Sequence, residues 1–197
     1  MYDQYIHAYE KISLSQAGLV MGTILIIIHL IALLCPRATR LFLQKAHDAT
    51  LLGQTTLGIA MAWIMLLLLE QDWNPLTINL YEFNGIRGYL LLACPIVWFI
   101  LSSMVKENLF PRALGLFLLL AVCVPLSAAF LKDPVTRLLI PIWCYPVLTA
   151  AMFLVAKPYL FRDAMAWLCN KPKLFITAAA LGLIYGIAIL TCAILYW

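Results

Sequence analysis

Four cysteines and three prolines lie at similar depths of apolar segments and are the first candidates for a functional site. They are Cys94, Cys123, Cys144 and Cys192, with Pro95, Pro125 and Pro146. A proline inside a helix removes a backbone donor, kinks the helix and leaves a carbonyl one turn earlier unpaired. Kinks at one depth predict an outward-facing crevice between helices. Its candidate lining residues are Cys94, Pro95, Trp98, Cys123, Pro125, Ser127, Trp143, Cys144 and Pro146.

Two interpretations of this crevice follow from its chemistry. Free carbonyls, a hydroxyl and indole rings would bind a small solute, and thiolates would bind a soft metal such as Cu(I). Alternatively, each cysteine acts as a small hydrophobic residue in the packing of its helix. A shared depth is not a spacing of metal ligands, and the chain has no Cys-x-x-Cys pair. We therefore predict no metal site, and the crevice stays a hypothesis.

His29 is the only histidine inside an apolar segment, since His7 lies in the N-terminal tail and His47 in a connection. A bis-histidine haem requires a second histidine within the bundle, so the sequence predicts no cofactor. Two roles remain for His29 as a polar intramembrane residue. It belongs to a site, or it forms a hydrogen bond with a polar residue of another helix such as Gln54 or Thr55, and we favour the second.

The motifs of common enzymes are absent from the sequence. We find no His-Glu-x-x-His, Gly-x-Ser-x-Gly or Walker loop, and no Asp, Glu, Lys or Arg inside the six apolar stretches. Pumps and ion-coupled transporters usually keep ionisable groups at mid-membrane. We therefore predict no catalytic residue, with an enzyme acting on lipid as a low-ranking alternative.

The elements that position these residues are six charge-free stretches in a very apolar chain. Hydrophobic residues make up 65% of the 197 residues, charged residues 11%, and the mean hydropathy is +0.98. A helix of about 20 residues crosses the hydrocarbon core of a membrane. The sequence predicts an all-α polytopic integral membrane protein, a single transmembrane domain over residues 1–197 with six helices. They span residues 16–35, 51–69, 88–105, 113–131, 138–156 and 174–197.

A short motif recurs after the third and fifth stretches. Pro95 is followed by Lys106 and Leu109-Phe110, and Pro146 is followed by Lys157 and Leu160-Phe161 at the same spacing. Read as a repeat, the motif predicts a bundle of three helical hairpins. Read as chance, it is ordinary anchoring of a helix end at the membrane surface. Residues 157–173 also have the composition of an amphipathic helix lying on that surface.

Small residues mark two candidate packing faces. In a membrane, helices associate by close contact between small residues rather than by the hydrophobic effect. The first helix carries Gly18 and Gly22, and the last carries Ala178, Gly182 and Gly186 at intervals of four. We predict that neighbouring helices approach closely at both faces.

The distribution of basic residues predicts the orientation. The chain has 13 Lys and Arg residues, of which nine fall in the connections after the first, third and fifth helices and four on the other side. The positive-inside rule places both termini outside, in the periplasm of a bacterium, if the membrane is the cell inner membrane. Basic residues confined to short connections do not form a nucleic-acid surface, so we expect membrane lipids and other integral membrane subunits as partners.

These observations favour one function over another. With no buried charge and little mass outside the membrane, the chain suits a non-catalytic subunit of a respiratory, photosynthetic or secretion complex, packing through its small-residue faces. The alternative is a transporter of a small solute or soft metal that uses the cysteine and proline crevice. The two differ in whether Cys94, Cys123 and Cys144 are accessible from the outer side.

Overall fold

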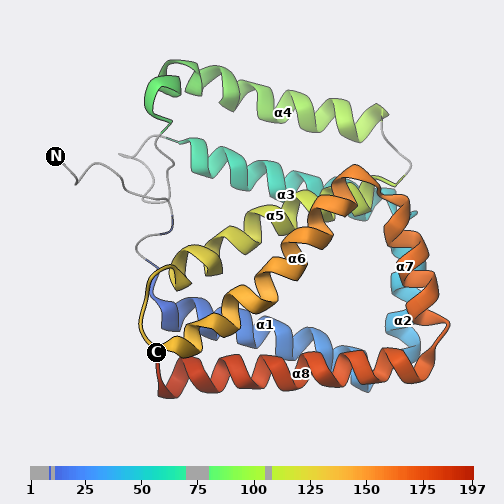
Figure 1. The fold of residues 1–197 in the computed structure, drawn as a ribbon. Coiled ribbons are helices and arrows are strands. Elements are labelled where there is room, and N and C mark those ends of the chain that lie inside the picture. Colours follow the sequence, from blue (N-terminus) through green and yellow to red (C-terminus); the bar gives the residue numbers. More distant parts are fainter. Residues whose placement is uncertain (1–8, 10–11, 70–79, 105–107) are drawn as a thin grey trace.

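The computed structural model describes residues 9, 12–69, 80–104 and 108–197, with the backbone alone for residues 81–83. Six helices in this part of the chain are long and apolar enough to cross a membrane, so the protein is an all-α, multi-pass membrane protein (Figure 1). Each matches its predicted stretch within four residues at either end. They are α1 (Leu14–Leu34), α3 (Thr50–Leu68), α4 (Arg87–Met104), α5 (Leu109–Ala129), α6 (Leu139–Ala156) and α8 (Pro172–Leu195).

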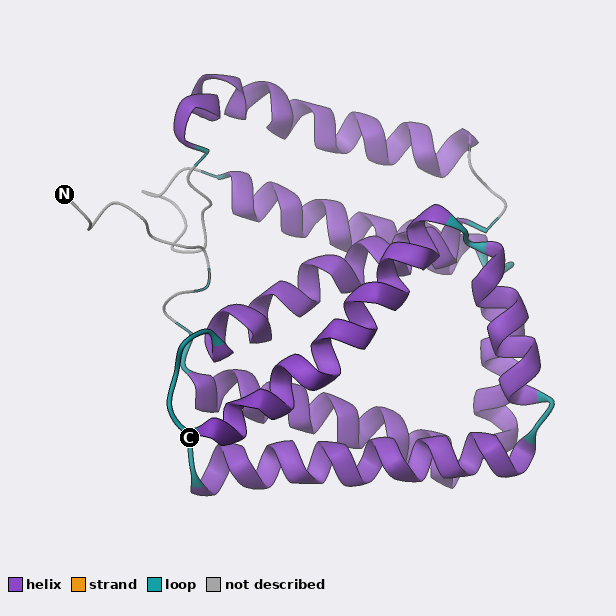
Figure 2. Cartoon of the chain, in the orientation of Figure 1, coloured by secondary structure: helices purple, strands orange, loops and turns teal. Residues whose placement is uncertain are grey.

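Shorter helices and brief loops join the six spans, and Figure 2 shows no strand among the described residues. The structure confirms a helix in the segment predicted to be amphipathic, as α7 (Tyr159–Cys169). A second surface helix, α2 (Pro36–Ala46), was not predicted. The 3₁₀ helices η1 (Tyr81–Ile86) and η2 (Val135–Leu138) precede α4 and α6.

Local sequence explains where α1 begins and where α2 follows it. Ser13 accepts a hydrogen bond at its hydroxyl from the backbone N–H of Gln16, and the Gln16 side chain accepts one from the backbone N–H of Ser13, each at 3.1 Å. This capping box satisfies two N–H groups that the helix itself leaves unpaired. Pro36 then starts α2 immediately after α1, because proline fits the first turn of a helix but not its interior.

The spans form an open row rather than a closed ring. The most extensive contact joins α1 to α8, and α5 lies between α3 and α6. At one edge, α4 packs extensively against α3 alone among the long helices (Figure 1). The predicted arrangement of three hairpins is therefore wrong. It requires close packing of three pairs that the structure does not pack closely: α1 with α3, α4 with α5, and α6 with α8. In two of these connections, α2 and α7 separate the spans.

Glycines allow the close contact between α1 and α8. A Cβ atom at Gly18 would overlap the Trp197 ring, and one at Gly22 would lie 3.0 Å from the backbone of Leu190. The predicted faces of Gly18 and Gly22 and of Gly182 and Gly186 therefore meet each other.

Ala178 does not belong to this contact, which corrects its assignment to the packing face. It is exposed, while Ala179 is buried with Phe175 against Ala32 of α1. Residues spaced by four advance about 40° more than one full turn of a 3.6-residue helix at every step. Over two steps from Gly186, the stripe therefore turns away from the neighbour.

Candidate functional site

The predicted crevice residues are dispersed over the row of helices. Cys94 is buried on α4, Cys144 is 1% exposed in the core around α6, and Cys123 is exposed on α5. Because α3 and α5 lie between α4 and α6, the structure does not bring Cys94 and Cys144 together (Figure 1). Among the described residues, no group of three or more His, Cys, Asp or Glu side chains is arranged to hold a metal ion.

The prolines and the other crevice residues also lack a common interior. The helices continue through all three prolines, and Pro95 and Pro146 are exposed on the outside of their helices while Pro125 is half-buried. Trp98 donates from Nε1 to the carbonyl of Gln54 on α3 at 3.2 Å, and Ser127 is half-buried on α5. Trp143 meets another candidate residue, His29, edge to face.

His29 occupies a junction of three helices. Its Nδ1 atom is 2.7 Å from the carbonyl oxygen of Leu25, one turn earlier on α1. A carbonyl only accepts hydrogen bonds, so Nδ1 carries the proton and Nε2 of the neutral ring is an acceptor. The prediction that His29 bonds to Gln54 or Thr55 is wrong. Gln54 donates to the carbonyl of Ser102, and the Thr55 hydroxyl donates to carbonyls of its own helix.

Gly182 of α8 makes room for the His29 ring. A Cβ atom at Gly182 would overlap Nε2, Cδ2 and Cε1 of the imidazole, which are the three nearest atoms. The ring therefore lies flat against the α8 backbone, where any other residue would displace it. This contact explains why a small residue is needed at this point of α8.

An aromatic cluster continues from His29 into α6 and α8. The His29 and Trp143 rings meet edge to face with centroids 6.2 Å apart, and Trp143 stacks on Tyr185 at 5.4 Å. The Tyr185 hydroxyl donates to the carbonyl of Leu139 at 2.6 Å. Aromatic pairs in these geometries are favourable beyond the area that they bury. We call His29, Trp143 and Tyr185 the aromatic cluster.

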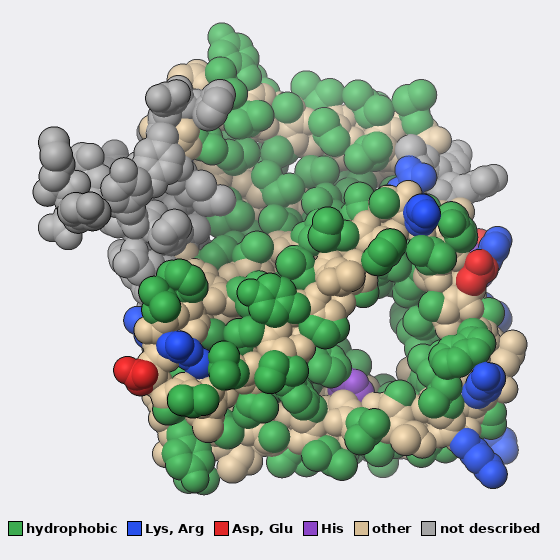
Figure 3. Space-filling view, viewed as in Figure 1, with side chains coloured by type: hydrophobic (Ala, Val, Ile, Leu, Met, Phe, Trp, Pro, Cys, Tyr) green, Lys and Arg blue, Asp and Glu red, His purple; other side chains and the backbone are tan. Residues whose placement is uncertain are grey.

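Between the helices that carry this cluster, the molecule has an opening. Figure 3 shows a gap through the space-filling surface, bounded by α6, by α8 with α1, and by α7 with α2, with a histidine at its rim. Side chains around it are mostly hydrophobic. The opening lies beside the middle of α8, within the span that crosses the membrane. A molecule dissolved in the membrane therefore has a lateral path into the opening.

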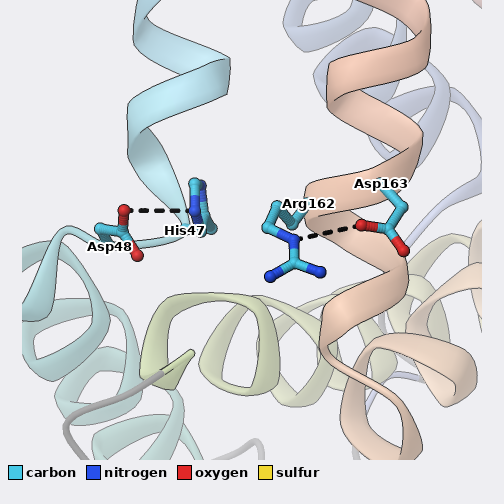
Figure 4. Close-up of polar contacts among 4 residues, drawn as sticks. All are labelled: His47, Asp48, Arg162 and Asp163. Atoms are coloured by element: carbon cyan, nitrogen blue, oxygen red, sulfur yellow. Dashed lines mark hydrogen bonds and ion pairs between the residues drawn. The ribbon is translucent and has the colours of Figure 1, made fainter.

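Two ion pairs lie at the α2 and α7 end and do not form a site. His47 Nε2 is 3.2 Å from Asp48 Oδ2, and Arg162 Nε is 3.1 Å from Asp163 Oδ1 (Figure 4). Each joins neighbours in the sequence, and both members of the second pair are 56% exposed. Exposed pairs of this kind contribute little to stability. Neither pair is bonded to the other, so the two pairs do not provide an acid and a base for one reaction.

Sequence reasoning found His29 and Trp143 but missed Tyr185 and the opening. Tyr185 is the one tyrosine in the interior of α8, and a hydroxyl at that depth requires an acceptor, so a signal existed. The opening has no sequence signal, because it results from how far α6 diverges from α8. Comparisons with protein-family models, curated proteins and solved structures find no match to this chain.

Proposed function

We propose that the protein is a non-catalytic subunit of a larger complex in a bacterial inner membrane, of a respiratory, photosynthetic or secretion type. The supporting observation is the position of α4 at the edge of the row. It packs extensively on α3 alone among the long helices, and Cys94 and Ser102 are its buried residues. Another subunit would bind on the side of α4 that faces away from α3.

The composition of α4 supports this role. Large side chains cover its outward side, among them Tyr89, Leu92 and Phe99, and Phe99 is 67% exposed. Lipid chains solvate such a face, but a helix held on one side by a single neighbour has the most surface free for a second protein. Helices that meet within a membrane bind through packing and aromatic contacts of this kind.

The charge distribution supports the orientation in the proposal. Lys and Arg side chains are more frequent at the α2 and α7 end of the molecule than at the opposite end (Figure 3). The ends of α1 and α8 that lead to the termini are both at the opposite end (Figure 1). By the positive-inside rule, α2 and α7 lie in the cytoplasm and both termini lie in the periplasm.

Purification from the native membrane in mild detergent, followed by mass spectrometry, tests the proposal. A photo-reactive residue in place of Phe99 on α4 should form an adduct with a second polypeptide. The matched control replaces Ile184, which is 63% exposed on α8. Other subunits at a fixed ratio and an adduct specific to α4 would support the proposal. A chain that purifies alone and cross-links only to lipid at both positions would contradict it.

A further inference from the structure

The aromatic cluster closes the narrow end of a wedge between α6 and α8. At this end, Trp197 donates from Nε1 to the Thr136 hydroxyl at 2.8 Å, and Tyr185 bonds to Leu139. Further inward, α6 diverges from α8, and the opening of Figure 3 begins. The wedge therefore has a fixed aromatic end and an open side within the membrane.

Two polar atoms at the narrow end lack a hydrogen-bond partner among the described residues. In the neutral imidazole, Nδ1 donates to the Leu25 carbonyl and Nε2 of His29 is an acceptor, whereas Trp143 Nε1 is a donor. Neither is among the described polar atoms that are fully buried without a partner, and both side chains are half-buried. In hydrocarbon an unpartnered polar group is unfavourable, because no water replaces the missing hydrogen bond. A ligand that bonds to these atoms would remove that cost.

The surroundings select the kind of ligand. The opening is apolar and at membrane depth, so its occupant comes from the lipid phase rather than from water. An acyl chain fills such a space but has no group to donate to His29 Nε2. A phenolic ring supplies the hydroxyl donor and a flat face for packing against Trp143.

We propose that the wedge between α6 and α8 binds a lipid-soluble phenol of the hydroquinone type, which enters laterally through the opening. Its hydroxyl donates a hydrogen bond to His29 Nε2, and its ring packs beside Trp143. Its apolar tail lies in the opening, between α8 and the α2 and α7 pair. This site is independent of the partner face on α4, which lies at the other edge of the row.

Binding of a decyl-substituted hydroquinone to the protein in lipid nanodiscs tests this proposal. The amount retained by protein-containing discs is compared with that in empty discs, under a reductant. We expect saturable binding of one molecule per chain. The dimethyl ether of the same probe keeps the ring and the tail but has no donor, and it should bind at least about tenfold more weakly, the effect of one lost hydrogen bond.

Variants locate the binding within the protein. His29→Phe should weaken hydroquinone binding to the level of the ether, and His47→Phe, which changes a histidine outside the spans, should leave it unchanged. The comparison of probe and ether needs no variant, so it decides the matter even if His29→Phe does not fold. Equal retention of hydroquinone and ether would overturn the proposal. Equal, His29-dependent binding of decanol would overturn the assignment of a phenol.

Discussion

Arg40 and Cys169 join the two surface helices through a reciprocal pair of hydrogen bonds. Arg40 Nη1 donates to the carbonyl of Cys169 at 3.3 Å, and Cys169 Sγ donates to the carbonyl of Arg40 at 3.7 Å. The two residues are 129 positions apart in the chain. Through this pair, α2 and α7 close the inner end of the opening between α6 and α8 (Figure 1).

The Cys169 thiol should therefore react slowly. Burial raises the pKa of Cys169 above its ordinary value, although the charge of Arg40 acts in the opposite direction. Only the thiolate is the nucleophile, so a raised pKa and a 4% exposed side chain both slow alkylation, and the rate should keep rising at alkaline pH. We expect a chain with Cys169 as its single cysteine to react with a maleimide at least about tenfold more slowly than one with the exposed Cys35.

Arg40→Ala supplies the control for this measurement. It removes the Nη1 bond to the Cys169 carbonyl and the charge that lowers the Cys169 pKa, but it keeps the backbone carbonyl that accepts from Sγ. The labelling rate of Cys169 should therefore fall further while the sulfur stays buried. Equal rates for Cys169 and Cys35 in the folded, unmodified protein would show that α2 and α7 are not held together.

A side chain at position 182 should separate α1 from α8. In Gly182→Ala, the added methyl group overlaps the His29 ring, and we expect a loss of about 1–3 kcal/mol in the free energy of unfolding. Adding His29→Ala should recover much of that loss, because the obstacle is the end of a side chain and not backbone. Unfolding in detergent measures both variants against the unmodified protein.

Gly88→Ala is the matched control, since no atom lies within 4 Å of a Cβ atom placed there. Alanine is a better helix former than glycine, so this change should leave stability unchanged or raise it slightly. If Gly182→Ala were as stable as Gly88→Ala, the close approach of α1 and α8 would be refuted.

Tyr9→Phe should destabilise the protein and remove a pH dependence. The Tyr9 hydroxyl accepts a hydrogen bond from Trp63 Nε1 at 3.0 Å, and its loss should cost about 1 kcal/mol. Burial, as the largest cause, raises the pKa of Tyr9. The unfolded chain therefore releases this proton at a lower pH than the folded protein does, so the stability that Tyr9 adds is complete below a pH of about 10 and declines above it.

The stability difference between the unmodified protein and Tyr9→Phe should accordingly shrink as the pH rises above the pKa of free tyrosine. The other tyrosines titrate in both proteins and cancel in the comparison. A difference that stays constant or grows with pH would contradict the burial of the Tyr9 hydroxyl against Trp63.

Reporter fusions test the proposed orientation. Alkaline phosphatase, which is active only outside the cytoplasm, should be active when fused after Trp197 and inactive when fused after Asn170, between α7 and α8. The physical reason is the excess of Lys and Arg in the connections that hold α2 and α7. The opposite pattern of activity would reverse the orientation.

The six spans were predictable because a membrane imposes one strong rule on sequence. Long stretches without charge leave few alternatives, and the prediction of 88–105 differs from α4 (Arg87–Met104) by one residue at each end. The short helix α2 was missed, since eleven residues with both basic and apolar side chains between two spans also fit a loop.

The pairing of spans and the site were harder to predict. The glycines of α1 and α8 indicated faces for close contact but not that these faces belong to each other. The crevice prediction used depth alone, and depth does not fix which way a side chain points around its helix or which helices adjoin. Cys94 and Cys144 have similar depths but are separated by two other helices.

The α1 and α8 contact also constrains biosynthesis. The earliest span to leave the ribosome has its principal partner in the last of the six, so α1 is inserted before any surface complementary to Gly18 and Gly22 exists. Until translation passes Pro172, lipid must solvate that face. A nascent chain thus lacks this contact until α8 is made, and termination before α8 would leave the Gly18 and Gly22 face exposed to quality-control proteases.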